Sequence, residues 1–307
     1  MLEERSKPAM DAPLLRVFRE DFLTTSLPPG IAPANDPALP RFGAFAPNAA
    51  QAAIIALAQR TGLKLGAFRP MLSRLVNLCR AGPVDVPYQG ASFRFYHQAS
   101  ATERGALFNP DYNLEELDFL RAHVPPGGVF VDVGANVGTY AMVLARHVGD
   151  GGKVIAIEPH PVIHARLAFN RAASGVVQVT LVAAAAGPAD GELMIETDSG
   201  NLGASHIVSG EGTGRGIRVP SLRLLRILGD AGVGHVDALK IDVEGFEDRV
   251  LTGFFKEAPE RLWPRAVVIE HLSRNEWQDD CIADMRARGY GETGRTRSNT
   301  FLLRGSS

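Results

Sequence analysis

The second half of this chain repeats one pattern, in which a short continuous run of apolar residues is followed by a segment with apolar residues at helical spacing. The apolar runs cover residues 129–133, 154–157, 176–186, 238–241 and 266–269. Continuous apolar strands are typical of sheets that are buried on both faces, and parallel strands need a long connection such as a helix between them. The pattern therefore predicts an α/β fold, with a mostly parallel sheet and helices on both faces.

The end of the chain departs from this pattern. Trp277, Cys281 and Met285 recur every four residues, which predicts one face of a helix. Residues 290–293 and 300–303 flank a polar, glycine-containing stretch and predict a closing hairpin.

We expect three segments along the chain. Residues 1–47 are rich in proline and predict a flexible leader, because closely spaced prolines prevent long helices. Residues 48–112 predict a helical and hairpin cap, with helical spacing over 49–80 and an alternating pattern over 84–96. Residues 113–307 then form the α/β domain.

The boundary between the cap and this domain carries local signals. Residues 109–112, Asn-Pro-Asp-Tyr, predict a turn ahead of a helix. Asn113 stands in the N-cap position of that helix and Glu116 follows three residues later, which is the spacing of a capping box. Pro125 predicts that the helix has ended before it.

Composition narrows the classes of partner. The 32 basic and 34 acidic residues nearly balance, so we expect no nucleic-acid partner. Cys79 and Cys281 are too few for a zinc site or a disulfide framework, and the start of the chain has no secretory pattern, so we expect a cytoplasmic protein. The uncharged stretches 42–59 and 172–189 are interrupted by polar residues, proline or glycine, and predict no integral membrane segment. The sequence specifies no oligomeric state.

The first strand runs into a glycine-containing loop, residues 131–138, with the sequence Val-Asp-Val-Gly-Ala-Asn-Val-Gly. Dinucleotide sites have the spacing G-x-G-x-x-G, in which the middle glycine lets the backbone approach a pyrophosphate. Here Gly134 and Gly138 are four residues apart, and Asn136 would crowd a pyrophosphate. Asp132 adds an acid just before the loop. The loop therefore suits a ligand that has no phosphate and carries a cationic amino group.

S-adenosylmethionine is such a ligand, because its ammonium and sulfonium groups favour nearby carboxylates. Its own carboxylate can meet backbone N–H groups at the helix start after Gly138. Glu158 ends the second strand and can accept hydrogen bonds from the ribose hydroxyls, each worth about 1.5–3 kcal/mol when charge-assisted. The predicted cofactor-binding residues are Asp132, Gly134, Ala135, Asn136, Gly138, Glu158, Pro159, Ala184 and Asp242. Without a ligand, the same positions are ordinary turn glycines and loop acids.

Acidic side chains follow the fourth and fifth predicted strands. Asp242, Glu244 and Glu247 come after the fourth strand, and Glu270 and His271 end the fifth. Since neighbouring parallel strands end at the same edge of the sheet, these groups converge beside the predicted cofactor.

Methyl transfer from a sulfonium needs an aligned acceptor and a base that removes its proton. The candidate catalytic residues are Asp242, His271 and Glu244, with His271 or Asp242 as the base. Three plainer roles stay open: Asp242 only lines the pocket, Glu244 caps a helix and His271 is a strand-end residue. Asp242, Glu244 and His271 could also ligate Mg²⁺, although we expect no metal.

The chain resembles the FkbM family of S-adenosylmethionine-dependent methyltransferases over about residues 113–304. The resemblance rests on residues 131–138, on Ala156 to Pro161 (AIEPHP) with Asn170, on Lys240 to Glu247 (KIDVEGFE), on Val268 to His271 (VIEH), and on Gly289 with Tyr290. It implies a seven-stranded class I (Rossmann-like) sheet with an antiparallel last strand. It also implies O-methylation of a hydroxyl on a small molecule, sugar or lipid.

Two further expectations concern the adenine contacts and the acceptor pocket. Where many class I enzymes have an acid for the adenine amino group, this chain has Ala184 and Ala185, so we expect adenine to be held by backbone and apolar contacts. The glycine-rich stretch 201–206 is either plain loop or part of an acceptor pocket.

Two functions other than methyl transfer stay open. One is that of a nicotinamide-dependent oxidoreductase, and the other is that of a protein that binds the cofactor without catalysis.

Overall fold

The computed structural model describes residues 40–198, 201–208 and 216–305, and the side chains of all of these except 197–208. Most of the expected leader, residues 1–39, lies outside the described residues. Within them, no helix combines the length and the hydrophobicity that crossing a bilayer requires.

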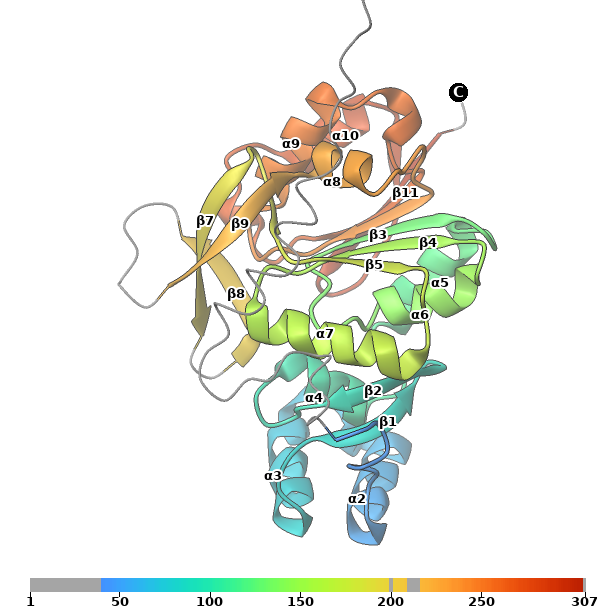
Figure 1. Cartoon of the computed structure of the whole chain (residues 1–307), viewed down its shortest axis with the longest axis vertical. Helices are drawn as coiled ribbons and strands as arrows, with labels where there is room; N and C mark the ends of the chain where they lie inside the picture. Colours follow the sequence, from blue (N-terminus) through green and yellow to red (C-terminus); the bar gives the residue numbers. More distant parts are fainter. Residues whose placement is uncertain (1–39, 199–200, 209–215, 306–307) are drawn as a thin grey trace, which may run out of the picture.

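A seven-stranded sheet forms the centre of the molecule, as predicted (Figure 1). Its order is β12-β13-β11-β10-β3-β4-β5. The parallel strands are β3 (Val129–Val133), β4 (Lys153–Ile157), β5 (Val179–Val182), β10 (Ala238–Ile241) and β11 (Ala266–Glu270). The closing hairpin is also confirmed: β13 (Asn299–Arg304) pairs antiparallel with β11 and with β12 (Tyr290–Arg295).

Helices cover both faces of this sheet (Figure 1). One layer holds α5 (Leu114–His123), α6 (Ala141–Val148) and α7 (Pro161–Ser174). The other holds α8 (Leu224–Asp230), α9 (Glu247–Glu257) and α10 (Cys281–Ala287), with the short turns η3 (Glu260–Leu262) and η4 (Arg274–Glu276). Each layer has its own apolar cluster against the sheet, which is what continuous apolar strands require.

The prediction of one strand over residues 176–186 is wrong. β5 ends at Val182, opposite Ile157, the last residue of β4. The neighbouring chain leaves β4 after Ile157 and enters α7 at Pro161, so β5 has no further strand residues to pair with. The chain leaves the sheet and forms β6 (Ala185–Gly187) in a second sheet of order β6-β9-β7-β8.

This second sheet was not foreseen. Its other strands are β7 (Gly191–Asp198), β8 (Asn201–Val208) and β9 (Ile217–Arg223). The stretch 201–206, expected as loop or acceptor pocket, is part of β8.

The expected capping box at the start of α5 does not form. Asn113 is the N-cap residue, but its backbone is left-handed (φ 57°) and its side chain makes no capping bond. The Glu116 carboxylate instead accepts hydrogen bonds from Thr296 Oγ1 at 2.7 Å and Asn299 Nδ2 at 3.0 Å. Contacts with the closing hairpin therefore replace the local pattern.

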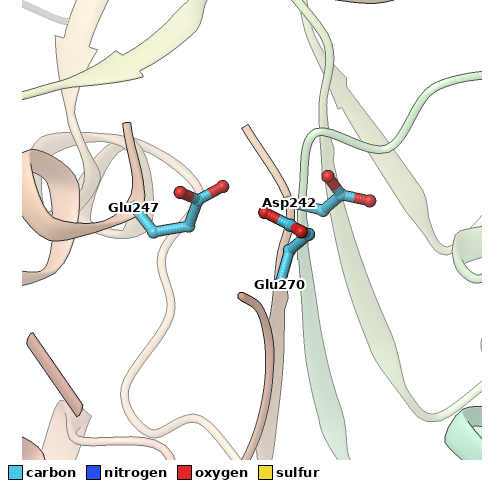
Figure 2. A group of neighbouring side chains, drawn as sticks. All are labelled: Asp242, Glu247 and Glu270. Atoms are coloured by element: carbon cyan, nitrogen blue, oxygen red, sulfur yellow. The ribbon is translucent and has the colours of Figure 1, made fainter. Parts of the chain in front are cut away.

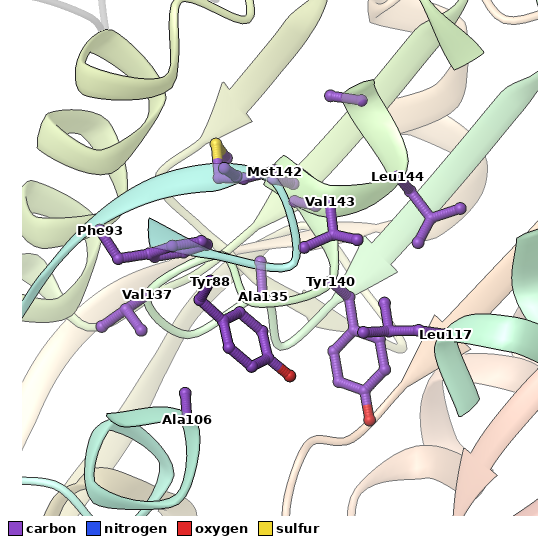
Figure 3. Packing of buried hydrophobic residues seen from close by; sticks show 14 of the residues in the cluster. Tyr88, Phe93, Ala106, Leu117, Ala135, Val137, Tyr140, Met142, Val143 and Leu144 are labelled. Carbon is purple, nitrogen blue, oxygen red and sulfur yellow. The ribbon is translucent and has the colours of Figure 1, made fainter. Parts of the chain in front are cut away.

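The N-terminal region contains the predicted helices and hairpin. α2 (Ala49–Arg60) and α3 (Arg69–Cys79) are joined by η1 (Gly62–Lys64) and η2 (Gly66–Phe68), and β1 (Val84–Tyr88) pairs with β2 (Ala91–Phe95). A further helix, α4 (Ala101–Phe108), was not predicted. Figure 3 shows Tyr88, Phe93 and Ala106 of this region packed with Val137 and Met142 of the α/β domain, and all five belong to one buried cluster.

One buried arginine ties the start of the described chain to this hairpin. Arg94 donates to both carboxylate oxygens of Asp85, at 2.7 and 2.9 Å. It also donates to the carbonyl oxygens of Pro40 and Arg41, and its guanidinium lies 4.1 Å from the ring centre of Phe169 in α7. Residues 40–47, expected within the leader, are thus held against β1 and β2.

We predict that Arg94→Met lowers the free energy of unfolding by about 3–5 kcal/mol, because it leaves the Asp85 carboxylate buried without its partner. Urea unfolding measures this change. Arg218→Met is the matched control, since Arg218 and Glu192 form a pair whose side chains are 67% and 60% exposed. The control costs less than about 1 kcal/mol, and equal losses in the two variants would contradict the prediction.

Candidate active site

A cavity lies at the carboxyl ends of β3, β4 and β10, where the predicted site residues gather. The space between its lining residues, including the part open to solvent, amounts to about 1030 Å³. The sequence-predicted residues among its lining are Gly134, Ala135, Asn136, Glu158, Pro159, Asp242 and Glu244. The cavity therefore lies where the sequence predicts the site, at the ends of the parallel strands.

The glycine loop closes tightly onto β10. Gly134 has φ +74°, and a Cβ built there would lie 1.9 Å from the carbonyl oxygen of Asp242. Asn136 is also left-handed (φ 51°), a conformation that asparagine tolerates, and its N–H donates to Glu158 at 3.0 Å. Gly138 is left-handed too, and a Cβ there would collide with Leu167. The loop therefore needs glycine at both predicted positions.

Glu158 is the acid that faces the cavity from β4. One carboxylate oxygen accepts from Asn136 N, and the other accepts from His160 N at 2.8 Å. Each oxygen keeps a lone pair for a ligand. Burial raises the pKa of Glu158 to about 7, even though both backbone bonds favour the charged form.

Lys240 is the central residue that the sequence reasoning left without a role. It lies on β10, is 3% exposed, and its Nζ donates to the Gly134 carbonyl oxygen at 2.9 Å. Nζ is also 3.7 Å from Asp132 Oδ1 and 3.6 Å from Asp242 Oδ2. Burial lowers the pKa of Lys240, but the carboxylates of Asp242 and Asp132 outweigh burial and raise it. A lysine inside an apolar strand was the available signal.

Asp132 occupies a different place from the one expected. It is fully buried and is not among the residues that line the cavity. One oxygen accepts from the Ala141 N–H at the start of α6, at 3.0 Å, and the other faces Lys240. Burial raises the pKa of Asp132 to about 6, against the opposing effect of Lys240. Its contacts are with the protein's own helix and lysine.

Glu244 and Asp242 bring carboxylates into the cavity from the end of β10. Glu244 has a left-handed backbone (φ 53°), which is uncommon for glutamate and concentrates at functional sites. Burial raises the pKa of Glu244 to about 7, and the charges of Asp242 and Glu270 add to this effect. The site therefore contains a carboxyl group that titrates near neutrality.

A second group of acids lies beside Asp242. Figure 2 shows Asp242, Glu247 and Glu270 together, with carboxylate oxygens within 4.8 Å of one another. These three side chains could reach one hard cation. The possible metal ligands named from the sequence were instead Asp242, Glu244 and His271. Glu247 already accepts from Val243 N at 2.7 Å and from Trp277 Nε1 at 2.8 Å. Burial raises the pKa of Glu247 to about 7.

Four predicted site residues are not among those that line the cavity: Asp132, Gly138, Ala184 and His271. His271 is half-buried, its Nδ1 lies 3.0 Å from Thr300 Oγ1, and its N–H donates to Ser298 O at 2.9 Å. Ala184 is buried in the apolar cluster between the central sheet and the α8–α10 layer, and Ala185 and Ala186 line the cavity in its place.

One wall of the cavity comes from segments that the motifs did not indicate. It includes Thr102 of α4, Tyr112 and Asn113 before α5, and Ser298 and Asn299 of the closing hairpin. Asn299 is 7% exposed, and its Oδ1 has no hydrogen-bond partner among the described residues. No sequence signal could have joined these segments, because only the tertiary fold brings them together.

The strand order and this cavity define a class I methyltransferase fold. The family model of the FkbM methyltransferase domain matches residues 132–291, just over half of the sequence, and the chain belongs to this family. Membership confirms the resemblance and implies S-adenosylmethionine as methyl donor; it overturns the nicotinamide alternative. None of the curated proteins matches the sequence.

Solved structures of similar fold are methyltransferases. An O-methyltransferase from Thermotoga maritima is 16% identical with a TM-score of 0.39, covering 63% of this chain and 66% of its own. A methyltransferase from Geobacter sulfurreducens is 16% identical with a TM-score of 0.40, covering 64% of this chain and 79% of its own. The precorrin-6y C5,15-methyltransferase from Geobacter metallireducens is 12% identical with a TM-score of 0.37, covering 64% of this chain and 90% of its own. At these values the likeness bears on neither substrate nor mechanism.

The residues present fit S-adenosylmethionine. Among the described residues that line the cavity, the acids are Glu158, Asp242 and Glu244, and the cation is Lys240, whose ammonium is engaged by the protein. Such a lining favours a cationic ligand and repels a pyrophosphate. Apolar side chains of Ile157, Ile163, Ala185 and Ala186 provide a surface for a flat base.

We predict that Gly134→Ala weakens both folding and ligand binding, because its Cβ would collide with the Asp242 carbonyl. Gly175→Ala is the matched control: Gly175 is left-handed (φ 67°, ψ 22°), but nothing lies within 4 Å of its Cβ position. The control carries only the left-handed backbone cost of about 1–2 kcal/mol. Urea unfolding and calorimetric titration with S-adenosylhomocysteine compare the two variants. Equal stability losses with equal affinities would show that the close approach to β10 is unimportant.

Proposed function

We propose that this protein transfers the methyl group of S-adenosylmethionine to a hydroxyl of a small molecule, sugar or lipid. One observation carries the proposal. Carboxylates at the ends of β4 and β10 share a single cavity with hydroxyl and amide side chains that come from outside the matched family domain. The first set suits the donor, and the second set suits a polar acceptor.

The donor side of the cavity is formed by the glycine loop and β4. When bound, S-adenosylmethionine supplies a methyl group on a sulfonium, which is already activated for transfer. Glu158 would accept hydrogen bonds from the ribose hydroxyls, and Ala185 and Ala186 would contact the base. Asp242 would face the positive charge, and its Oδ2 lies 3.6 Å from Lys240 Nζ.

Glu244 is the general base of the proposed reaction. It lines the cavity, and its pKa of about 7 matches the requirement for a base that works near neutral pH. It takes the proton of the acceptor hydroxyl as the methyl group is transferred. His271, which does not line the cavity, positions the hairpin through Ser298 and Thr300.

The acceptor side favours a hydroxyl-bearing molecule. Asn299 Oδ1 is a buried acceptor atom without a partner among the described residues, and a buried acceptor gains most from a ligand O–H. Thr102 and Ser298 supply further hydroxyl groups around it. A purely apolar acceptor would leave these polar groups unpaired.

The proposal is tested with the purified protein, methyl-labelled S-adenosylmethionine and an extract of cells that lack the protein. We expect one extract component to become labelled and heavier by one methylene, and its label to resist alkaline hydrolysis, as a methyl ether does and a methyl ester does not. Labelling of a nitrogen or carbon atom would contradict O-methylation. Cofactor binding without any labelled product would favour the non-catalytic alternative.

We predict that affinity for S-adenosylhomocysteine rises as the pH increases through about 7, by at most about tenfold per pH unit, and then levels off. The free protein holds Glu158 protonated below its raised pKa, whereas ribose hydroxyls bind its charged form. Calorimetric titration of the native protein and of Glu158→Gln measures the difference, in which the ligand's own titration cancels. Parallel pH curves for the two proteins would refute this role.

We predict that Glu244→Gln lowers kcat about 10²- to 10⁴-fold and removes the kcat limb near pH 7. Asp242→Asn moves that limb to lower pH, because a neighbouring charge that raises the Glu244 pKa is gone. His271→Gln retains the limb. These profiles are measured on the acceptor found in the labelling experiment. Loss of the limb in His271→Gln, with its retention in Glu244→Gln, would make histidine the base.

A further inference from the structure

The N-terminal helices expose an apolar face that the proposed reaction does not use. Nine large hydrophobic side chains are exposed in the described part of the chain, and six of them lie between residues 57 and 78. These six are Leu57, Leu65, Phe68, Met71, Leu75 and Leu78, and Leu78 is 81% exposed. We call them, with the cations between them, the α2–α3 face. Concentrations of this kind mark interaction sites.

The face has a regular construction on α3. Met71, Leu75 and Leu78 follow at helical spacing on the exposed side, while Leu72 and Val76 are buried on the other. The helix α3 therefore has apolar residues on two sides, and the fold leaves one of these sides uncovered. Figure 1 shows α2 and α3 side by side at the end of the molecule opposite α9 and α10.

The charge of this region is exclusively positive. Residues 49–80 contain Arg60, Lys64, Arg69, Arg74 and Arg80, and none of the 34 acidic residues of the chain. Lys64 pairs with Asp111, and Arg69 and Arg80 donate to backbone carbonyls. Arg60 and Arg74 are exposed, and within the described residues neither forms an ion pair. Arg74 lies beside Leu75 and Leu78 on the same helix side.

We propose that the α2–α3 face docks on an anionic phospholipid surface. Exposed leucine, phenylalanine and methionine side chains interleaved with basic ones are the composition of helices that lie in the membrane interface. The apolar side chains enter the boundary of the acyl chains, while the arginines remain at the charged headgroups. This orientation needs no spanning helix.

Charge decides between this occupant and the others. A symmetric pair of copies would bring the same cationic face against itself, which costs electrostatic energy. A nucleic-acid backbone would satisfy the arginines, but the six apolar side chains would gain nothing. An anionic bilayer satisfies both sets at once.

The docking surface also reaches the cavity wall. Arg69, the first residue of α3, lies 5.5 Å from the ring centre of Tyr112, and Tyr112 lines the cavity. Docking would thus place the acceptor side of the site near the lipid surface. Docking of this face does not depend on which group is methylated.

The test is sedimentation of the purified full-length chain with vesicles. Phosphatidylcholine vesicles are compared with vesicles that also contain phosphatidylglycerol. We expect binding to the anionic vesicles only, weakening as salt is added. Leu75→Ser with Leu78→Ser, and separately Arg60→Glu with Arg74→Glu, each reduce this binding at least about tenfold.

Matched controls lie elsewhere on the surface. Val177→Ser with Leu272→Ser removes two other exposed hydrophobics, and Lys256→Glu with Arg261→Glu reverses two other exposed charges. We expect both controls to bind vesicles like the native protein. The two α2–α3 variants and the two controls all bind S-adenosylhomocysteine normally. Glu158→Gln, a site variant, keeps full vesicle binding, so failure of the reaction and failure of docking are distinguishable.

Three outcomes overturn the proposal. The first is an absence of binding to the anionic vesicles. The second is binding that the controls reduce as much as the α2–α3 variants do. The third is a dimer in the absence of vesicles that Leu75→Ser with Leu78→Ser dissociates, which would assign the face to a second copy.

Discussion

The geometry of the site depends on one buried ammonium group. Lys240 lies opposite Asp132 in the register of β10 and β3, and its Nζ holds the Gly134 carbonyl at 2.9 Å. A charge at this depth is costly unless carboxylates balance it, and Asp132 and Asp242 lie on either side. The same contacts fix the loop that meets the ligand and the acid that ends β10. Stability and site geometry therefore share one set of contacts.

The sheet could be predicted because burial on both faces leaves a plain record in the sequence. Each parallel strand is a short apolar run, and the helices between them show apolar spacing. The errors occur where a partner elsewhere in the chain decides. β5 ends where β4 ends, and Glu116 bonds to Thr296 and Asn299, which are far away in sequence. Local patterns carry no information about such partners.

The same division runs through the site. Gly134, Asn136, Glu158, Asp242 and Glu244 were found because parallel strands end at one edge of the sheet. Asp132 was predicted to contact the cofactor, but in the structure it contacts Lys240 and the start of α6. The sequence cannot tell whether an acid on a strand faces a ligand or a lysine. The wall with Thr102, Tyr112 and Asn299 was missed because three separate segments build it. The residues proposed to bind the donor therefore follow local motifs in the sequence, and those proposed to bind the acceptor do not.

The N-terminal region supports the donor site as well as the acceptor wall. Asn170 of α7 accepts a hydrogen bond from Arg94 N at 2.9 Å and donates to the Val137 carbonyl at 3.0 Å. Val137 lies inside the glycine loop, and Arg94 is the residue that anchors β2 to Asp85 and to residues 40 and 41. One fully buried asparagine thus connects the hairpin to the loop. A buried amide with both ends satisfied holds its neighbours at fixed positions, so displacement of the hairpin would disturb the loop that we propose binds the methyl donor.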